Sequence, residues 1–465
     1  MNVVKALRIS GADVLPLFEG GKGVAVSNGV SAGAWAATGG VGTFSGVNAD
    51  FIDELGRRVP LVYRGRTRKE RHDELMEHSI RGGLSQAKIA HDMSAGQGRV
   101  HMNVLWEMAG CERVLHGVLE QARGLIHGIT CGAGMPYRLS EIAAQYGVHY
   151  HPIVSSGRAF RALWKRAYHR FSDWLGSVVY EDPWLAGGHN GLSNNEDPTV
   201  AQDPYPRVAE LRRTMRHVGL DETPIVMAGG VWWLRDWSDW IDNPELGPIA
   251  FQFGTRPLLT QESPIPEVWK QRLLELNPGD VLLQRFSPTG FYSSAVHNEF
   301  LQELIGRSER QVAFRDQGDE TFVAPYALNA RGKQVYLSAE DAVRVADWRE
   351  QGFTTAMRTP DDTLIFVTPE VARQIKRDQA DCMGCLSHCR FSNWATNETN
   401  TTGHLPDPRS FCIQKTLQDI SHGGDIDSNL MFAGHNVFKF REDPFYANGF
   451  VPTVRQLVQR IRAGD

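Results

Sequence analysis

Four of the six cysteines lie close together in the sequence, at a spacing that suits metal coordination. Cys382, Cys385, Cys389 and Cys412 form the pattern C-x2-C-x3-C-x22-C. Four thiolates of this kind can bind either a tetrahedral zinc ion or a [4Fe–4S] cluster. Zinc sites usually pair two short C-x2-C units, whereas this pattern is a triplet followed by a distant single cysteine. We therefore predict an iron–sulfur cluster and keep zinc as the alternative.

A histidine stands where a catalytic base would be expected. His189 follows an apolar run and a glycine pair in the segment VVYEDPWLAGGHNG. Imidazole titrates near neutral pH, so it can take up and release a proton under ordinary conditions. At the C-terminal end of a strand its ring would face a site and act as a general base.

Two glycine-rich turns predict a phosphate site. Gly229 and Gly230 end the run MAGGVW, and Gly254 and Thr255 end the run QFGTRPLL. Glycine lets backbone N–H groups approach a phosphate closely, and barrel enzymes often bind phosphate after their last two strands. The chain has no GxGxxG fingerprint followed by a ribose-binding acid, so a mononucleotide such as FMN fits better than a dinucleotide.

These residues require a frame of alternating strands and helices. Helix-like stretches at 113–123, 157–171 and 205–219 separate short apolar runs. The predicted strands are 41–46, 100–106, 125–132, 149–155, 177–182, 224–230 and 249–255, with an opening strand around 23–27. Such alternation predicts a parallel sheet, and the count of eight predicts a closed (β/α)8 TIM barrel.

The pattern changes beyond about residue 260. Helices are predicted at 267–276, 298–307 and 453–464, and the stretch 307–380 is polar and mixed. We predict an FMN-binding barrel over residues 1–305. Residues 306–465 are predicted to form a mixed extension that carries the four-cysteine metal site and packs on the barrel.

Composition narrows the classes of function. The 465 residues carry 49 Lys and Arg against 54 Asp and Glu, a formal charge of −5, which argues against general nucleic-acid binding. No run approaches 18 apolar residues, and the N-terminus resembles no signal peptide. We expect a cytoplasmic enzyme, a homo-oligomer without a membrane partner, that acts on a small molecule.

The glycine and histidine motifs resemble the nitronate monooxygenase family, formerly called 2-nitropropane dioxygenases. The similar segments are LFEGGKGVAVSNGVSAGAWAATGGVGTFSG, YEDPWLAGGHNG, PIVMAGGVW and AFQFGTRPLLTQES, with a weaker return at FAGHN (432–436). The resemblance implies an FMN-dependent TIM barrel that oxidises alkyl nitronates with dioxygen, with His189 as the base. By motif, the flavin would contact Gly21, Lys22, Gly23, Asn103, Glu181, Gly188, Gly229, Gly230, Gln252, Gly254 and Thr255.

Two residues depart from the family pattern. Lys22 stands where the family usually has Met, and a cation there would favour reduced, anionic flavin. Cys131 ends a strand where a small or apolar residue is expected, and we interpret it as a buried small hydrophobe.

The cysteine segment implies a second function. CMGCLSHC is similar to the C-x-G-C-x-x-x-C stretch of iron–sulfur flavin reductases built on TIM barrels, although their fourth cysteine is closer. The alternative is therefore a reductase of an enoyl thioester or similar acceptor that uses NAD(P)H or ferredoxin as electron donor.

Two further segments leave alternatives open. The basic stretch 57–74 is either a solvated helix face or a docking surface for an anionic or macromolecular partner. The tryptophans of WWLRDWSDW (232–240) either cover the flavin pocket or seal the helical layer of the barrel.

Overall fold

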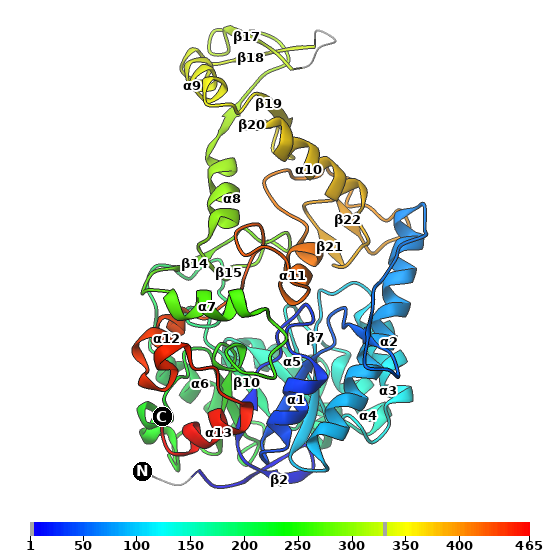
Figure 1. The fold of residues 1–465 in the computed structure, drawn as a ribbon, viewed down its shortest axis with the longest axis vertical. Helices are drawn as coiled ribbons and strands as arrows, with labels where there is room; N and C mark the ends of the chain where they lie inside the picture. The colour runs from blue at the N-terminus through cyan, green and yellow to red at the C-terminus, as the bar shows by residue number, and fades with distance from the viewer. Residues whose placement is uncertain (1–3, 329–332) are drawn as a thin grey trace.

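The computed structural model describes residues 4–328 and 333–465 and contains a closed barrel of eight parallel strands (Figure 1). Neighbouring strands follow the order β10-β12-β13-β3-β4-β7-β8-β9. The barrel strands are β3 (Leu17–Glu19), β4 (Val41–Ser45), β7 (Arg99–Leu105), β8 (Gly128–Gly132), β9 (His149–Val154), β10 (Val178–Glu181), β12 (Ile225–Ala228) and β13 (Ile249–Phe253). The predicted TIM barrel is confirmed.

The predicted strand at 23–27 is wrong. The first barrel strand is β3, and residues 23–26 form a turn. Ser27 N–H donates to the carbonyl of Lys22 (2.9 Å), and Ala25 has a φ of +58°. A left-handed residue does not fit an extended strand, and the hydrogen bond closes residues 22–27 into a loop. This apolar segment is therefore a buried loop above the barrel.

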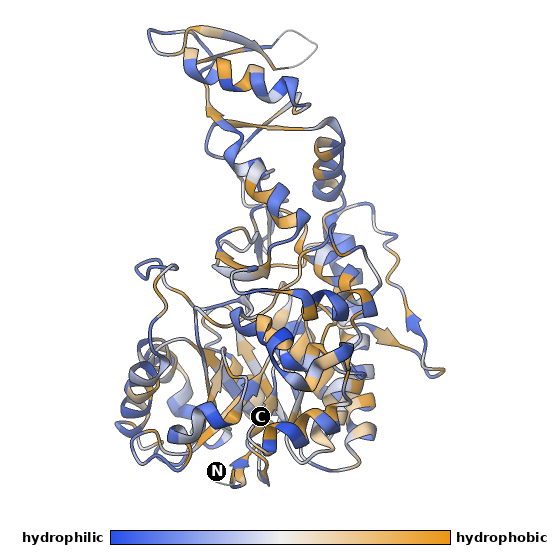
Figure 2. Ribbon diagram, turned by 60° about the vertical axis from the view of Figure 1, so that its left-hand side comes forward, coloured by the Kyte–Doolittle hydropathy of each residue, from blue (hydrophilic) through white to orange (hydrophobic). Residues whose placement is uncertain are grey.

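Helices surround the barrel and connect its strands. They are α1 (Gly29–Ala36), α2 (Arg68–Ser94), α3 (Cys111–Gln121), α4 (Leu139–Tyr146), α5 (Gly157–Arg166), η1 (Tyr168–Trp174), α6 (Pro204–Arg216) and η2 (Leu234–Trp240). Figure 2 shows hydrophobic barrel strands inside a layer of helices that carry both kinds of residue. The C-terminal helix α13 (Val454–Arg462) packs against α1 and completes this layer, although almost the whole chain separates the two helices.

Local sequence accounts for the helix starts. Asn28, Ser156 and Asp203 accept backbone N–H bonds at the starts of α1, α5 and α6. Thr67 and Thr453 form capping boxes with Glu70 and Gln456 at the starts of α2 and α13. Each cap satisfies a backbone donor that has no partner within the helix, so these boundaries are encoded locally.

A short hairpin closes the N-terminal end of the barrel. It consists of β1 (Leu7–Ile9) and β2 (Ala12–Val14), and Ile9 and Val14 pack into the barrel interior on Phe18 and Val179. The interior is therefore filled from this end, and the opposite end is left for a site. A second hairpin, β5 (Phe51–Ile52) and β6 (Arg58–Val59), follows β4.

Residues 256–298 lie over the barrel, and residues 299–328 and 333–380 form a projection beyond it (Figure 1). The elements of this part are η3 (Arg256–Leu258), α7 (Glu267–Glu275), β14 (Val281–Gln284), β15 (Ser293–Val296), α8 (Glu299–Glu309), β16 (Gln311–Ala313), β17 (Ala324–Ala327), β18 (Gln334–Leu337), α9 (Ala339–Glu350), β19 (Thr355–Arg358), β20 (Thr363–Val367) and α10 (Pro369–Ala380). The projection has its own small core around Val335, Leu337 and Phe366.

The remaining chain returns to the barrel. Its elements are β21 (His388–Cys389), β22 (Trp394–Ala395), α11 (Ile413–Ser421), η4 (His435–Phe438), α12 (Lys439–Glu442), η5 (Pro444–Gly449) and α13. The boundary predicted at residue 305 stays a prediction. Over the described residues, no helix has the length and apolar character needed to cross a membrane.

Candidate active site

A large pocket lies at the C-terminal ends of the barrel strands, and residues at the end of every strand contribute to its lining. All twelve residues predicted as base or flavin contacts border it. They are Gly21, Lys22, Gly23, Asn103, Glu181, Gly188, His189, Gly229, Gly230, Gln252, Gly254 and Thr255. The fold thus brings together segments that lie far apart in the sequence.

His189 lies in β11 (Gly188–His189), which pairs with β15 rather than with the barrel. Nε2 of His189 lies 2.6 Å from Oγ of Ser287, and the ring packs edge-to-face with Phe432, with 5.4 Å between the ring centroids. Burial lowers the pKa of His189 to about 4. The ring is therefore neutral at pH 7 and can accept a proton.

Glu181 ends strand β10 inside the pocket. Burial, with a smaller contribution from the charge of Asp182, raises the pKa of Glu181 to about 8. Asp182 itself accepts backbone N–H bonds from Trp184 (2.9 Å) and Leu185 (2.8 Å), which fixes the loop that leads to His189. A carboxyl group that is protonated near pH 7 can donate a hydrogen bond or a proton.

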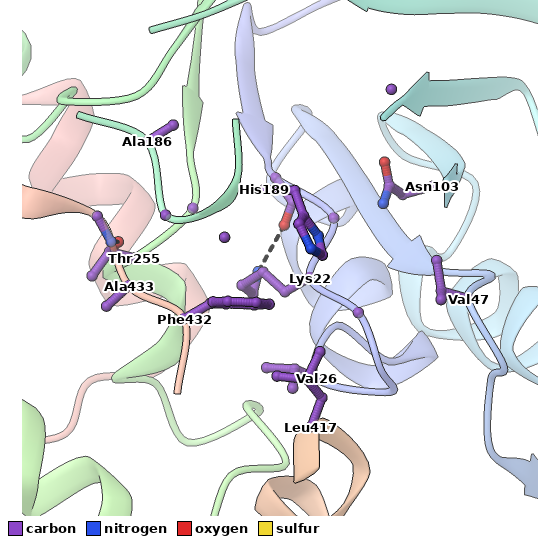
Figure 3. Close-up of a pocket in the computed structure, with 18 of the residues that line it drawn as sticks. Lys22, Val26, Val47, Asn103, Ala186, His189, Thr255, Leu417, Phe432 and Ala433 are labelled. Carbon is purple, nitrogen blue, oxygen red and sulfur yellow. Dashed lines mark hydrogen bonds between the residues drawn. The ribbon is translucent and has the colours of Figure 1, made fainter. Parts of the chain in front are cut away.

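Lys22 forms an ion pair at the end of β3. Its Nζ donates to Oε1 of Glu19 (3.0 Å) and to the carbonyl of Gly20 (2.8 Å). Figure 3 shows Lys22 in the middle of the pocket, near His189 and Phe432. Burial raises the pKa of Glu19, and the nearby ammonium group of Lys22 opposes this increase.

The glycine loops after β12 and β13 line one end of the pocket, and the loop after β13 leaves open space there. Gly229 and Gly230 have φ values of +87° and +78°, which favour glycine. A Cβ at Gly254 would meet no atom within 4 Å. The chain can therefore approach a ligand with its bare backbone at this end.

A C-terminal segment covers these glycine loops. Gly434 N–H donates to Oγ1 of Thr255 (3.0 Å), and Asn436 Nδ2 donates to the carbonyl of Gly230 (2.7 Å). Figure 3 shows Ala433 beside Thr255. The segment FAGHN thus belongs to the site, as its weak resemblance to the family suggested.

The four clustered cysteines lie next to the pocket. Cys385 borders it, and Cys412 caps the N-terminus of α11. Burial raises the pKa of the Cys385 thiol well above its usual range, and the charges of Cys412, Cys389 and Cys382 add to the increase. However, the described residues include no group of three or more His, Cys, Asp or Glu side chains that could hold a metal ion.

Two arginines of the basic stretch 57–74 contact the cysteine segment, whereas Arg57, Arg58, Arg64, Arg66 and Lys69 of this stretch are exposed. Arg68 donates to Oδ1 of Asn393 (2.6 Å), and Arg71 donates to the carbonyls of Ala380 (2.9 Å) and Cys382 (3.2 Å). These arginines therefore hold the cysteine segment against α2.

The tryptophans divide between the two predicted roles. Trp232 is buried and borders the pocket. Trp237 and Trp240 pack on each other in the helical layer outside the barrel, with 4.8 Å between their ring centroids. Cys131 is fully buried in the main core, in agreement with its interpretation as a small hydrophobe.

Several pocket residues had no sequence signal. Leu417 and Ile420 of α11 close the pocket from above, and Ser287 contacts the histidine. The amphipathic pattern of α11 predicts that one face is buried but not what covers it. A lone serine in a loop carries no pattern at all.

Comparison with known proteins agrees with this geometry. A family model described as nitronate monooxygenase matches residues 118–353, just over half of the chain. No curated protein matches the chain. FabK from Thermotoga maritima is 13% identical, with 97% of this chain and 92% of that chain covered and a TM-score of 0.52. The enoyl reductase domain of MlnA from Bacillus amyloliquefaciens is 12% identical, with 97% and 94% covered and a TM-score of 0.52. At such identities these two structures show a shared fold only.

Proposed function

Because the chain belongs to the nitronate monooxygenase family, we propose that it is an FMN-dependent oxidoreductase that oxidises alkyl nitronates with dioxygen. The observation that carries this proposal is the pocket in which His189 and all the motif-derived flavin residues meet. The substrate class follows from the family and is the part of the proposal that needs a direct test.

The residues of the pocket fit a flavin mononucleotide. The phosphate would lie at the loop that contains Gly254, where a Cβ would meet no atom within 4 Å, with Gly229 and Gly230 beside it in the pocket lining. Trp232 borders the pocket, and its buried Nε1 has no hydrogen-bond partner among the described residues. A buried donor without a partner is costly unless a ligand satisfies it.

His189 and Lys22 each have a defined task in this proposal. FMN, when bound, accepts electrons from the substrate and passes them to dioxygen. His189, kept neutral by burial, takes the proton from the carbon next to the nitro group when the substrate arrives as the neutral nitroalkane. Lys22 contributes positive charge at the end of β3, which favours binding of an anionic substrate.

The test is oxygen consumption by flavin-loaded protein supplied with a primary or secondary alkyl nitronate and with the matching nitroalkane. We expect His189→Gln to reduce turnover of the nitroalkane by about 100-fold or more, since general-base catalysis contributes 10²–10⁴-fold. His217→Gln, on an exposed helix end, is the matched control and should keep full activity. No oxygen consumption with any nitronate would refute the proposed substrate class.

A second candidate function is supported by the position of the cysteines. Cys385 borders the pocket, so a [4Fe–4S] cluster held by Cys382, Cys385, Cys389 and Cys412 would lie beside a bound flavin. A zinc ion is the alternative occupant, and the described residues form no ready group of three or more ligands for either metal centre. In this second candidate function the protein is a reductase of an enoyl thioester or similar acceptor, and NAD(P)H or a ferredoxin is the electron donor.

Metal analysis and anaerobic reduction separate the two candidates. About four irons and four sulfides per chain, with flavin reduction only by NAD(P)H or ferredoxin, would favour the reductase. Reduction by a nitronate without another donor would favour the oxygenase. One zinc per chain would make the cysteine site structural. The homo-oligomer and the cytoplasmic location stay predictions.

A further inference from the structure

Two hydroxyl groups continue from His189 toward the surface. Oγ of Ser287 lies 2.6 Å from Nε2 of His189 and 2.9 Å from Oγ1 of Thr289. The side chain of Ser287 is buried, whereas Thr289 is partly exposed and the next residue but one, Phe291, is exposed. The three groups thus form a continuous hydrogen-bonded chain from the pocket to the edge of the protein.

The backbone fixes the positions of both hydroxyls. Thr289 N–H donates to Oγ of Ser287 (3.3 Å), and Phe291 N–H donates to Oγ1 of Thr289 (3.2 Å). Each oxygen therefore already accepts one bond, and its own proton remains available to a neighbour. Such an arrangement can pass a proton in either direction, because each hydroxyl is both a donor and an acceptor.

The fold places this turn beside the histidine. Strands β14 and β15 form a hairpin, and β15 pairs with β11 so that His189 lies opposite Ser293. The turn at 285–292 is thereby placed beside the imidazole ring, with Ser287 at Nε2. Arg390 N–H donates to the carbonyl of Pro288 (3.2 Å), which ties the turn to the cysteine segment.

The two ring nitrogens of His189 have different surroundings. Nε2 contacts Ser287, whereas no described residue forms a hydrogen bond with Nδ1 in the pocket. The ring is therefore oriented with one nitrogen toward the hydroxyl chain, and the other remains available to a substrate.

We propose that Ser287 and Thr289 are positioning residues that form a proton relay between His189 and solvent. When Nδ1 accepts a proton from the substrate, Nε2 releases its proton to Ser287, Ser287 passes its own to Thr289, and Thr289 gives one to water. One proton enters and one leaves, and no electrons move. After the product departs, Nδ1 loses its proton to water in the pocket and Nε2 regains one through the same hydroxyls.

This inference rests on the proposed role of His189 as a base, so its test includes a measurement that needs no turnover. Histidine labelled with 15N in the flavin-loaded protein reports the tautomer of His189 and the exchange of its Nε2 proton with solvent, with His189→Gln to assign the signal. Thr289→Val keeps the shape of the side chain but removes the outer hydroxyl. Thr289→Ser, the matched control, keeps that hydroxyl.

We expect Thr289→Val to slow exchange at Nε2 and to lower kcat about tenfold with little change in KM, a fraction of what a general base contributes. Thr289→Ser should restore both, and Ser287→Ala should in addition mix the two tautomers. If the wild type turns over its substrate, the relay would be overturned by a Thr289→Val variant with an unchanged kcat or an unchanged exchange rate of the His189 Nε2 proton. If the wild type oxidises no nitronate and reduces no acceptor, the proposed function fails instead, and the exchange rates alone decide whether the hydroxyls connect His189 to solvent.

Discussion

Replacement of Gly254 by alanine should separate flavin binding from folding. A Cβ at Gly254 meets no atom within 4 Å, and its φ lies outside the left-handed region, so the substitution should cause no strain. Loss of backbone freedom in the unfolded chain should stabilise the protein without flavin by about 0.4–1 kcal/mol. The added methyl group enters the space that we assign to the phosphate, and displacement of the ligand there should weaken FMN binding by about 10- to 100-fold, or about 1.4–2.7 kcal/mol.

Ligand linkage turns this weakening into a measurable difference. At an FMN concentration 100 times the wild-type Kd, the flavin adds about 2.7 kcal/mol to the free energy of unfolding. After a 100-fold increase in Kd the same concentration would add only about 0.4 kcal/mol. Quenching of flavin fluorescence gives Kd, and urea unfolding with and without FMN gives the two free energies.

A contrasting variant tests the structural argument. At Gly229 a Cβ would lie 3.0 Å from Cβ of Asp182, with a φ of +87°, so Gly229→Ala should destabilise the protein even without flavin. If Gly254→Ala binds FMN with the wild-type Kd, the phosphate does not lie at this loop. If it loses stability without flavin, the description of the loop as open space is wrong.

Three other predictions concern titratable groups. Because the folded protein raises the pKa of Glu181 to about 8, it holds a proton that the unfolded chain releases above about pH 4.5, so stability should fall as pH rises from 4.5 to 8. Glu181→Gln, which mimics the protonated acid, should remove this loss and raise the free energy of unfolding at pH 8 by about 1–3 kcal/mol in urea titrations; an unchanged value would show that Glu181 is ionised. His101 and His151 share the hydroxyl of Ser10 (2.8 and 2.9 Å), and burial lowers both pKa values, that of His151 to about 3. Below about pH 6.5 the unfolded chain binds protons at these two histidines and the folded protein does not. The free energy of unfolding should therefore decrease on acidification by up to about 1.4 kcal/mol per pH unit for each histidine. His151→Asn should make this decrease with pH less steep, and an equally steep decrease in the variant and the wild type would contradict the argument. Lys22→Met should lower the midpoint potential of the bound flavin by a few tens of mV, about 30 mV for each 1.4 kcal/mol of lost attraction between the ammonium group and the reduced flavin. An unchanged potential would show that the ammonium group lies too far from the flavin to affect it.

The sequence alone predicted most of the barrel. Six of the eight strands fall within the predicted apolar runs and β7 begins one residue before its run, because a strand buried on both faces must be apolar and must end at turn residues. The error at 23–27 has a local cause that a pattern cannot show: the apolar side chains are buried, but by a loop closed between Ser27 and Lys22. Val24 and Val26 of this loop line the pocket.

The motif residues around the pocket were also within reach of the sequence, because they occupy strand ends and all strand ends of a parallel barrel meet at one rim. Tertiary structure alone decided which distant segments complete the site. Ser287 reaches His189 only because β15 pairs with β11, and Leu417 reaches the pocket only because α11 returns after the projection. Arg68 and Arg71 contact the cysteine segment across more than 300 residues. Such contacts depend on the three-dimensional arrangement of segments that are far apart in the sequence. A single polar or apolar residue in a loop has no periodic pattern around it, so its contact partner could not be inferred from the sequence.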